Sequence, residues 1–158
     1  MGYGCDVTGE GGESLKKVLL VEDDPNVTRG LLKHIPWNEL QIEVQDTAAN
    51  GEEALQKIEA KVPDIVITDV YMPTMDGLEL IKRLHAEYPS IHIIIHSGYD
   101  DFDNARLAMK FGVRHFFLKP VNVYEFKTVI KEVIQEMGAQ EKQKKLQEFY
   151  DRQSDQIL

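Results

Sequence analysis

The sequence predicts an α/β fold in which a parallel sheet carries helices on both of its faces. The first observation is that short apolar segments alternate with longer segments whose apolar residues recur at helical spacing. Short turns join them, and this alternation requires parallel strands with right-handed crossovers. The second observation is that several apolar segments end in polar or charged residues. Open α/β sheets bind their ligands at such strand ends.

The first elements follow from local patterns. Residues 17–22, Lys-Val-Leu-Leu-Val-Glu, predict a buried strand. Asp24 suits the N-cap of a helix with Pro25 at its first position, and Pro36 ends that helix. Apolar residues alternate with polar ones over 42–47, which predicts a half-exposed second strand.

The centre of the chain holds the segment around which the other elements are arranged. A second helix opens at Asn50-Gly51 and stops before Pro63. The run Ile-Val-Ile-Thr at 65–68 predicts a third strand that is buried on both faces, and Asp69 follows it directly. A proline and an Asp-Gly pair then turn the chain toward the next helix.

The second half of the chain repeats the same pattern. Helical spacing over 78–88 predicts a third helix, and the apolar run 91–95 predicts a fourth strand. A fourth helix is expected over 102–112 and a short fifth strand over 115–118. From Val123 a strong apolar stripe predicts a fifth helix.

We expect three regions along the 158 residues. Residues 1–15 are Gly-rich and acidic and predict a leader without signal-peptide character, either disordered or added for expression. Residues 16–137 form one domain. Residues 138–158 are mostly polar and predict either a fraying helical linker or a helix that continues toward a partner domain or a dimer mate.

Composition limits the possible functions. The formal net charge of −9 argues against direct nucleic-acid contact by this chain, because phosphate binding needs a basic face. No apolar run approaches the ~20 residues of a membrane span, so no membrane role is expected. The single cysteine, Cys5, cannot form an intrachain disulfide, and a cytoplasmic location is the simplest expectation. The five histidines share no metal-ligand spacing.

Polar side chains at four strand ends predict one site. Glu22, Asp23 and Asp69 should form a carboxylate cluster that needs a cation, and oxygen ligands favour Mg²⁺ or Mn²⁺ over Zn²⁺. Ser97 and Lys119 end the fourth and fifth strands at the same edge. A metal, an ammonium and a hydroxyl beside Asp69 suit phosphoryl transfer to that carboxylate.

Four motifs, in this order, resemble the receiver domain of a two-component response regulator over roughly residues 16–137. They are Val-Leu-Leu-Val-Glu-Asp-Asp-Pro, Ile-Thr-Asp-Val-Tyr-Met-Pro-Thr-Met-Asp-Gly, His-Ser-Gly-Tyr and Phe-Phe-Leu-Lys-Pro. The resemblance implies a flavodoxin-like (βα)5 doubly wound sheet of strand order 2-1-3-4-5. It also implies a cis peptide bond between Lys119 and Pro120.

The resemblance also implies roles for individual residues. Asp69 would be the phosphoacceptor, and the main-chain carbonyl of Tyr71 would join the metal ligands Glu22, Asp23 and Asp69. Lys119 and Ser97 would assist phosphoryl transfer. Phe116 would be the switch aromatic, although the family more often has Tyr there.

The resemblance implies a signalling domain rather than an enzyme. A sensor histidine kinase would donate the phosphoryl group, and a homodimer would form through the fourth helix, fifth strand and fifth helix. The Ile-Pro-Trp-Asn-Glu-Leu and Ser-Gly-Tyr-Asp-Asp-Phe-Asp-Asn-Ala segments resemble receivers joined to AraC-type helix-turn-helix domains, whose DNA-binding output would control transcription.

Three alternatives compete with this interpretation. A pseudo-receiver would keep the fold and signal without phosphorylation, but the acids, Ser97 and Lys119 are all present. An Asp-dependent phosphatase usually needs a second acid two residues after its nucleophile, where this chain has Tyr71. A flavin binder would have a Ser/Thr/Gly-rich loop after its first strand, where this chain has three acids.

Overall fold

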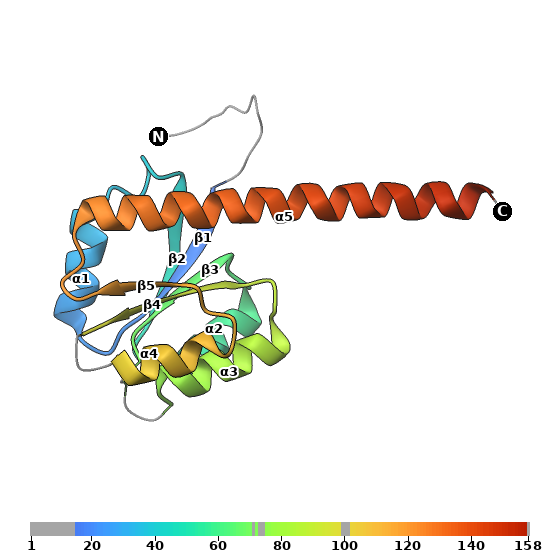
Figure 1. Ribbon diagram of the computed structural model, residues 1–158. Helices are drawn as coiled ribbons and strands as arrows, with labels where there is room; N and C mark the ends of the chain where they lie inside the picture. The colour runs from blue at the N-terminus through green and yellow to red at the C-terminus, as the bar shows by residue number, and fades with distance from the viewer. Residues whose placement is uncertain (1–14, 71, 73–74, 99–101, 158) are drawn as a thin grey trace. The chain divides into compact units, whose positions relative to one another are not determined.

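The computed structural model describes residues 15–70, 72, 75–98 and 102–157 (Figure 1). They form five strands and five helices in strict alternation. The elements are β1 (Lys16–Val21), α1 (Pro25–His34), β2 (Ile42–Ala48), α2 (Gly51–Ala60), β3 (Ile65–Thr68), α3 (Gly77–Glu87), β4 (His92–Ser97), α4 (Phe102–Met109), β5 (His115–Leu118) and α5 (Val123–Ile157).

The five strands form one parallel sheet in the order β2-β1-β3-β4-β5, which confirms the flavodoxin-like topology. The predicted strand bounds differ by one or two residues: β1 ends at Val21, before Glu22, and β4 extends through Ser97. The Lys119-Pro120 peptide bond is cis, as the resemblance implied. Among the described helices, none is both long enough and apolar enough to cross a lipid bilayer.

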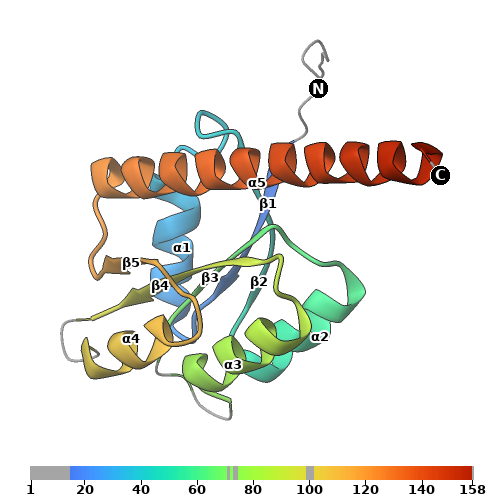
Figure 2. The same cartoon turned by 45° about the vertical axis from the view of Figure 1, so that its right-hand side comes forward.

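The sheet separates α1 on one face from α2, α3 and α4 on the other (Figures 1 and 2). The second face packs in two apolar clusters. One joins β1 and β3 to α2 and α3, and the other joins β4 to α3 and α4. The strand residues of these clusters are almost fully buried, and burying such side chains contributes roughly 1.5–3 kcal/mol each. This packing fixes the strand ends where the site lies.

Side-chain caps set where the helices begin. Asp24 accepts a hydrogen bond from the Asn26 amide at 2.9 Å, as predicted for the N-cap of α1. Asn50 accepts one from the Glu53 amide at 2.9 Å and caps α2. The start of α2 is therefore fixed in place. Met75, between β3 and α3, packs against this helix start.

The chain divides into two compact units, the first ending at Val121 and the second beginning at Asn122. The second unit consists of α5, a single helix of 35 residues that continues through Gly138. Buried apolar residues occupy one stripe of its first half: Phe126, Ile130, Val133 and Met137. The residues from 139 to 155 are exposed. The expected helical extension over 138–158 therefore has no break at 138, whereas its role as a linker stays a prediction.

Candidate functional site

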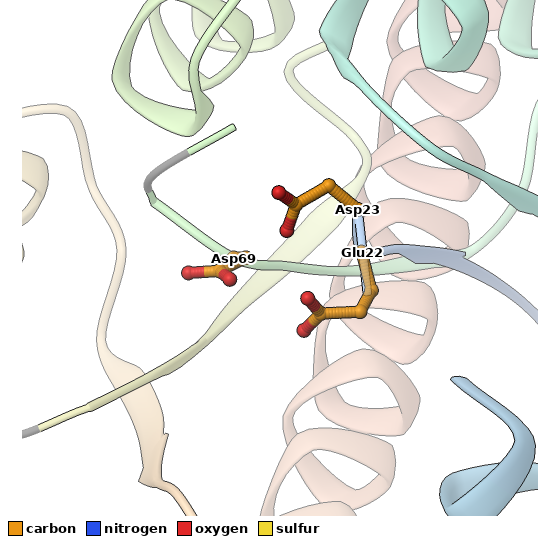
Figure 3. A group of neighbouring side chains, drawn as sticks. All are labelled: Glu22, Asp23 and Asp69. Atoms are coloured by element: carbon orange, nitrogen blue, oxygen red, sulfur yellow. The ribbon is translucent and has the colours of Figure 1, made fainter. Parts of the chain in front are cut away.

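Three carboxylates lie together where β1 and β3 end (Figure 3). Glu22 and Asp23 follow β1 directly, and Asp69 follows β3. One carboxylate oxygen from each of the three side chains lies within 4.8 Å of the others. Glu22 and Asp69 are only 5% and 6% exposed, whereas Asp23 is exposed to solvent. The acids that the strand ends predicted to converge therefore meet at one edge of the sheet.

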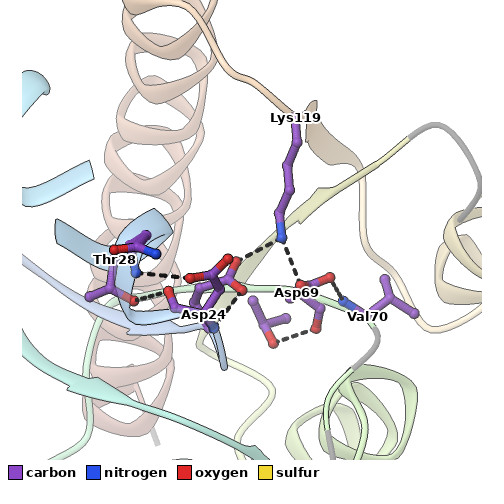
Figure 4. A network of polar contacts seen from close by, with 8 residues as sticks. Asp24, Thr28, Asp69, Val70 and Lys119 are labelled. Atoms are coloured by element: carbon purple, nitrogen blue, oxygen red, sulfur yellow. Dashed lines mark hydrogen bonds and ion pairs between the residues drawn. The ribbon is translucent and has the colours of Figure 1, made fainter. Parts of the chain in front are cut away.

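Lys119 binds two of these acids at once (Figure 4). Its Nζ lies 2.7 Å from Asp69 Oδ2 and 2.8 Å from Glu22 Oε1. Burial lowers the pKa of the ammonium, but hydrogen bonds to Asp69 and Glu22 outweigh this effect and raise the Lys119 pKa overall. Lys119 is therefore a permanent cation within the site.

The surroundings of Glu22 disfavour its charged form. Burial raises its pKa to about 7, although contacts with Lys119 and the Asp24 amide act in the opposite direction. The Asp24 amide donates to Glu22 Oε2 at 3.1 Å. Oε1 pairs with the Lys119 ammonium at 2.8 Å. The Glu22 carboxylate thus meets both an ammonium and a backbone amide.

Backbone groups fix the orientation of Asp69. The Val70 amide donates to Asp69 Oδ1 at 2.7 Å, so the two carboxylate oxygens have different partners. The Asp69 amide donates to the Val21 carbonyl at 3.0 Å, which continues the pairing of β3 with β1 beyond the strands. Thr68 Oγ1 donates to the Asp69 carbonyl at 2.8 Å. Asp69 is therefore held in one orientation before any ligand binds.

Gly77 lets the first turn of α3 approach the backbone of Asp69. Its amide donates to the Val70 carbonyl at 2.7 Å. A Cβ atom at Gly77 would lie 2.0 Å from the Asp69 carbonyl oxygen and 2.8 Å from Val70 Cα. Both of these neighbours are backbone atoms, so only glycine fits. The Asp-Gly turn is visible in the sequence, whereas this close approach is not.

The remaining predicted site residues belong to β4, β5 and the loop after β3. Ser97 is buried at the end of β4, and its carbonyl accepts a hydrogen bond from the Lys119 amide at 2.8 Å. Phe116 pairs with Ile95 in the sheet and is 40% exposed. The expected ligand at Tyr71, its main-chain carbonyl, lies outside the described residues.

His96 is a buried residue beside the site, and the sequence pattern assigned it no role. It lies between Ile95 and Ser97 in β4, is 4% exposed, and packs edge-on against Phe117 with ring centroids 6.4 Å apart. No hydrogen-bond partner of its Nε2 atom is present among the described residues. Burial, assisted by the positive charge of Lys119, lowers the His96 pKa to about 4. The only sequence signal was an imidazole inside an apolar strand.

The donor set fits a hard divalent cation. Three carboxylates face a single ammonium, so negative charge is in excess, and the ligand atoms that the cluster offers are all oxygens. Such ligands suit Mg²⁺ or Mn²⁺. A cleft of about 290 Å³ opens beside Glu22 and Asp23, between the start of α1 and the end of β2. Solvent and small solutes can therefore reach these two acids.

Comparisons with known proteins agree with this fold. A family model described as the response regulator receiver domain matches residues 18–131. The chain is similar to the solved receiver domain of AraT, a response regulator from Geobacillus stearothermophilus, with 33% identity and a TM-score of 0.76 over 80% of this chain and 98% of that one. A two-component transcriptional regulator AraC from Clostridium phytofermentans gives 34% identity and a TM-score of 0.71 over 77% and 94% of the two chains.

Curated relatives are longer than this chain. The transcriptional regulatory protein YesN of Bacillus subtilis, itself described as uncharacterized, is 44% identical over 82% of this chain and 35% of its own length. HptR of Staphylococcus aureus is 30% identical over 80% of this chain and 50% of its own length. The chain thus spans half or less of these relatives, which are named as transcriptional regulators. On the family match, the fold and the geometry of its acids, the chain belongs to the response regulator receiver domain family.

Proposed function

We propose that Asp69 accepts a phosphoryl group from a sensor histidine kinase and that this modification switches a transcriptional regulator. One observation carries the proposal: the Asp69 carboxylate is held 2.7 Å from the Lys119 ammonium and beside two further acids. A carboxylate that is already held in one orientation needs little reorganisation during the reaction. The domain would act as a signalling element rather than as an enzyme on a separate substrate.

In the proposed step, one Asp69 carboxylate oxygen attacks the phosphorus of a phosphohistidine. The new P–O bond forms while the P–N bond breaks, and the electron pair stays on the kinase imidazole. Lys119 offsets charge on the transferred oxygens, and the Ser97 hydroxyl donates a hydrogen bond to one of them. Glu22 and Asp23, together with Asp69 and the Tyr71 carbonyl, would hold Mg²⁺, or Mn²⁺ in its place. The metal, when bound, would supply positive charge to the phosphoryl oxygens.

The second part of the proposal concerns the output of the switch. We propose that movement of Ser97 and Phe116 after phosphorylation favours a homodimer through α4, β5 and α5. Exposed Leu107, Met109 and Phe116 would provide apolar contacts on the first two of these elements. DNA binding would belong to a further domain of AraC type, because this acidic chain has no excess of basic residues for phosphate contacts.

The decisive experiment is the intact mass of the protein after incubation with Mg²⁺ and acetyl phosphate. The wild type should gain one phosphoryl group, and Asp69→Ala should gain none because the attacking oxygen is absent. Asp46→Asn serves as the matched control. It removes an exposed carboxylate of β2 that pairs with Lys57, so this variant should be labelled like the wild type.

Two outcomes would contradict the proposal. Labelling of Asp69→Ala at the wild-type level would place the acceptor elsewhere. If the wild type gains no mass while the same donor labels another receiver, the alternative of a pseudo-receiver that signals without phosphorylation would replace the proposal.

Metal affinity should depend on pH because of Glu22. In the metal-free protein its pKa is raised to about 7, chiefly by burial, so below pH 7 a proton occupies the carboxylate that the metal needs. The apparent affinity for Mn²⁺ should fall by up to about tenfold per pH unit from pH 7 to pH 5. Titrations followed by the electron paramagnetic resonance signal of free Mn²⁺ would measure it. Glu22→Gln should bind more weakly and with a flatter pH profile, and equal slopes would exclude Glu22 as the cause.

A further inference from the structure

Gly51, at the start of α2, touches the loop that follows Asp69. Its amide donates to the Met75 carbonyl at 3.1 Å. A Cβ atom at Gly51 would lie 2.6 Å from Met75 Cγ and 2.9 Å from both Met75 Cβ and the Met75 carbonyl oxygen. Rotation of the Met75 side chain could relieve the first contact but not the other two, because Cβ and the carbonyl move only with the backbone.

Two described residues between β3 and α3, Val70 and Met75, therefore each accept a hydrogen bond at their carbonyl. The Gly77 amide donates to the Val70 carbonyl, and the Gly51 amide donates to the Met75 carbonyl. The second hydrogen bond comes from an element that contributes none of the candidate site residues. The start of α2 is itself held in place. Asn50 caps the helix, and Glu53 accepts a hydrogen bond from the Ala49 amide at 3.1 Å.

We propose that Gly51 is a positioning residue for the metal and phosphoryl site, acting through Met75. This inference rests on the proposed function. Met75 lies two residues before Gly77, whose amide donates to the Val70 carbonyl at 2.7 Å and whose backbone closely approaches the Asp69 carbonyl. Any displacement of Met75 therefore acts, through Gly77, on the backbone beside the phosphoacceptor.

The size of the displacement sets the expected effect. Ordinary contact begins at 3.4 Å, so a Cβ at Gly51 requires Met75 Cγ to retreat by 0.8 Å, the difference between 3.4 and 2.6 Å. The Met75 carbonyl must retreat by 0.5 Å, the difference between 3.4 and 2.9 Å. Sites of this kind tolerate about 0.5 Å of misplacement, and loss of a supporting residue typically weakens metal binding by about 10–100-fold.

The test compares Gly51→Ala with Gly30→Ala, a matched control in α1 where an added Cβ would meet no atom within 4 Å. Mn²⁺ affinity is measured by the electron paramagnetic resonance signal of the free metal. The phosphorylation rate is measured with acetyl phosphate at saturating metal. Gly51→Ala should lose at least about tenfold in Mn²⁺ affinity, and Gly30→Ala should match the wild type. Metal affinity of the folded protein is a readout that simple destabilisation would not change.

A second substitution tests the route of the effect. Met75→Ala removes Cγ but keeps Cβ and the carbonyl, the two atoms that rotation cannot move away, so Gly51→Ala should cost nearly as much affinity in a Met75→Ala background as in the wild type. If Gly51→Ala fails to fold, hydrogen exchange of the Gly51 amide in the wild type, measured with and without metal, tests the positioning role instead. Metal binding should slow exchange of the Gly51 amide at least several-fold, because coupling between two sites is reciprocal.

The outcomes separate this inference from the proposed function. If the wild type binds Mn²⁺ and is phosphorylated while Gly51→Ala keeps both properties, the positioning role is excluded and the proposed function remains. Unchanged exchange of the Gly51 amide on metal binding would likewise exclude it. If the wild type neither binds Mn²⁺ nor gains a phosphoryl group, the proposed function fails, and the inference fails with it.

Discussion

A Gly77→Ala variant is expected to lose about 3 kcal/mol or more of its free energy of unfolding. The added Cβ would lie 2.0 Å from the Asp69 carbonyl oxygen, and the nearest atoms all belong to backbone, so no side-chain rotation can relieve the overlap. The start of α3 would have to move away from β3. This movement would break the 2.7 Å hydrogen bond from the Gly77 amide to the Val70 carbonyl. Urea denaturation at neutral pH measures the loss.

Gly138→Ala is the control for Gly77→Ala, because the same substitution is expected to raise the free energy of unfolding there. Gly138 lies inside α5, where a Cβ would meet no atom within 4 Å, so alanine should gain up to about 1 kcal/mol from its helix propensity. A Gly77→Ala protein within about 1 kcal/mol of the wild type would show that α3 can shift at little cost. It would also show that the close approach beside Asp69 is not required for folding.

The second large effect is a pH-dependent loss of stability through His96. Burial lowers its pKa in the folded protein to about 4, whereas an exposed histidine titrates near 6.5. Between these two values the unfolded chain takes up a proton that folded His96 does not. The contribution of neutral His96 is therefore complete above pH 6.5 and is lost as the pH falls toward 4. The pKa difference corresponds to about 3 kcal/mol at most.

Glu22 acts in the opposite direction over part of the same pH range. Its raised pKa of about 7 makes the folded state bind protons more readily than the unfolded state between pH 7 and 4.5. The wild-type pH profile alone would therefore mix the two effects. Subtracting the profile of His96→Phe, which keeps a ring beside Phe117 but cannot titrate, isolates the histidine.

The measurement is the free energy of unfolding of both proteins at pH 7.5 and pH 5. The wild type should lose stability relative to His96→Phe by about 2 kcal/mol between these pH values, because the unfolded histidine gains about 1.4 kcal/mol per pH unit below 6.5. Identical changes in the two proteins would mean that folded His96 binds its proton normally, and hence that water reaches its ring.

Local patterns predicted most of the fold. The alternation of apolar segments located all five strands and the starts of the helices, and Asp24 was correctly assigned as the N-cap of α1. Strand ends shifted by one or two residues because pairing with a neighbouring strand, rather than local apolarity, decides where a strand stops. The sequence left open whether residues 138–158 form a fraying linker or a continuing helix, and α5 is continuous to Ile157.

Much of the candidate site was also visible in the sequence. Residues that end parallel strands must meet at one edge of the sheet, which predicted the grouping of Glu22, Asp23, Asp69 and Lys119. The sharing of one ammonium by two carboxylates could not be predicted, because it depends on side chains separated by up to 97 positions, the difference between 119 and 22. Such contacts depend on sheet order and twist, which local patterns do not encode.

The sequence by itself determined the family, the parallel sheet and the identity of the acids at its edge, because these depend on residue type and on periodicity along the chain. Only the tertiary structure decided that Gly77 must admit the Asp69 carbonyl, that Gly51 must admit Met75, and that His96 loses its access to water. The physical reason is the same in each case. Steric exclusion and burial depend on which atoms the folded chain brings within a few ångströms, and periodicity along the chain does not encode those contacts.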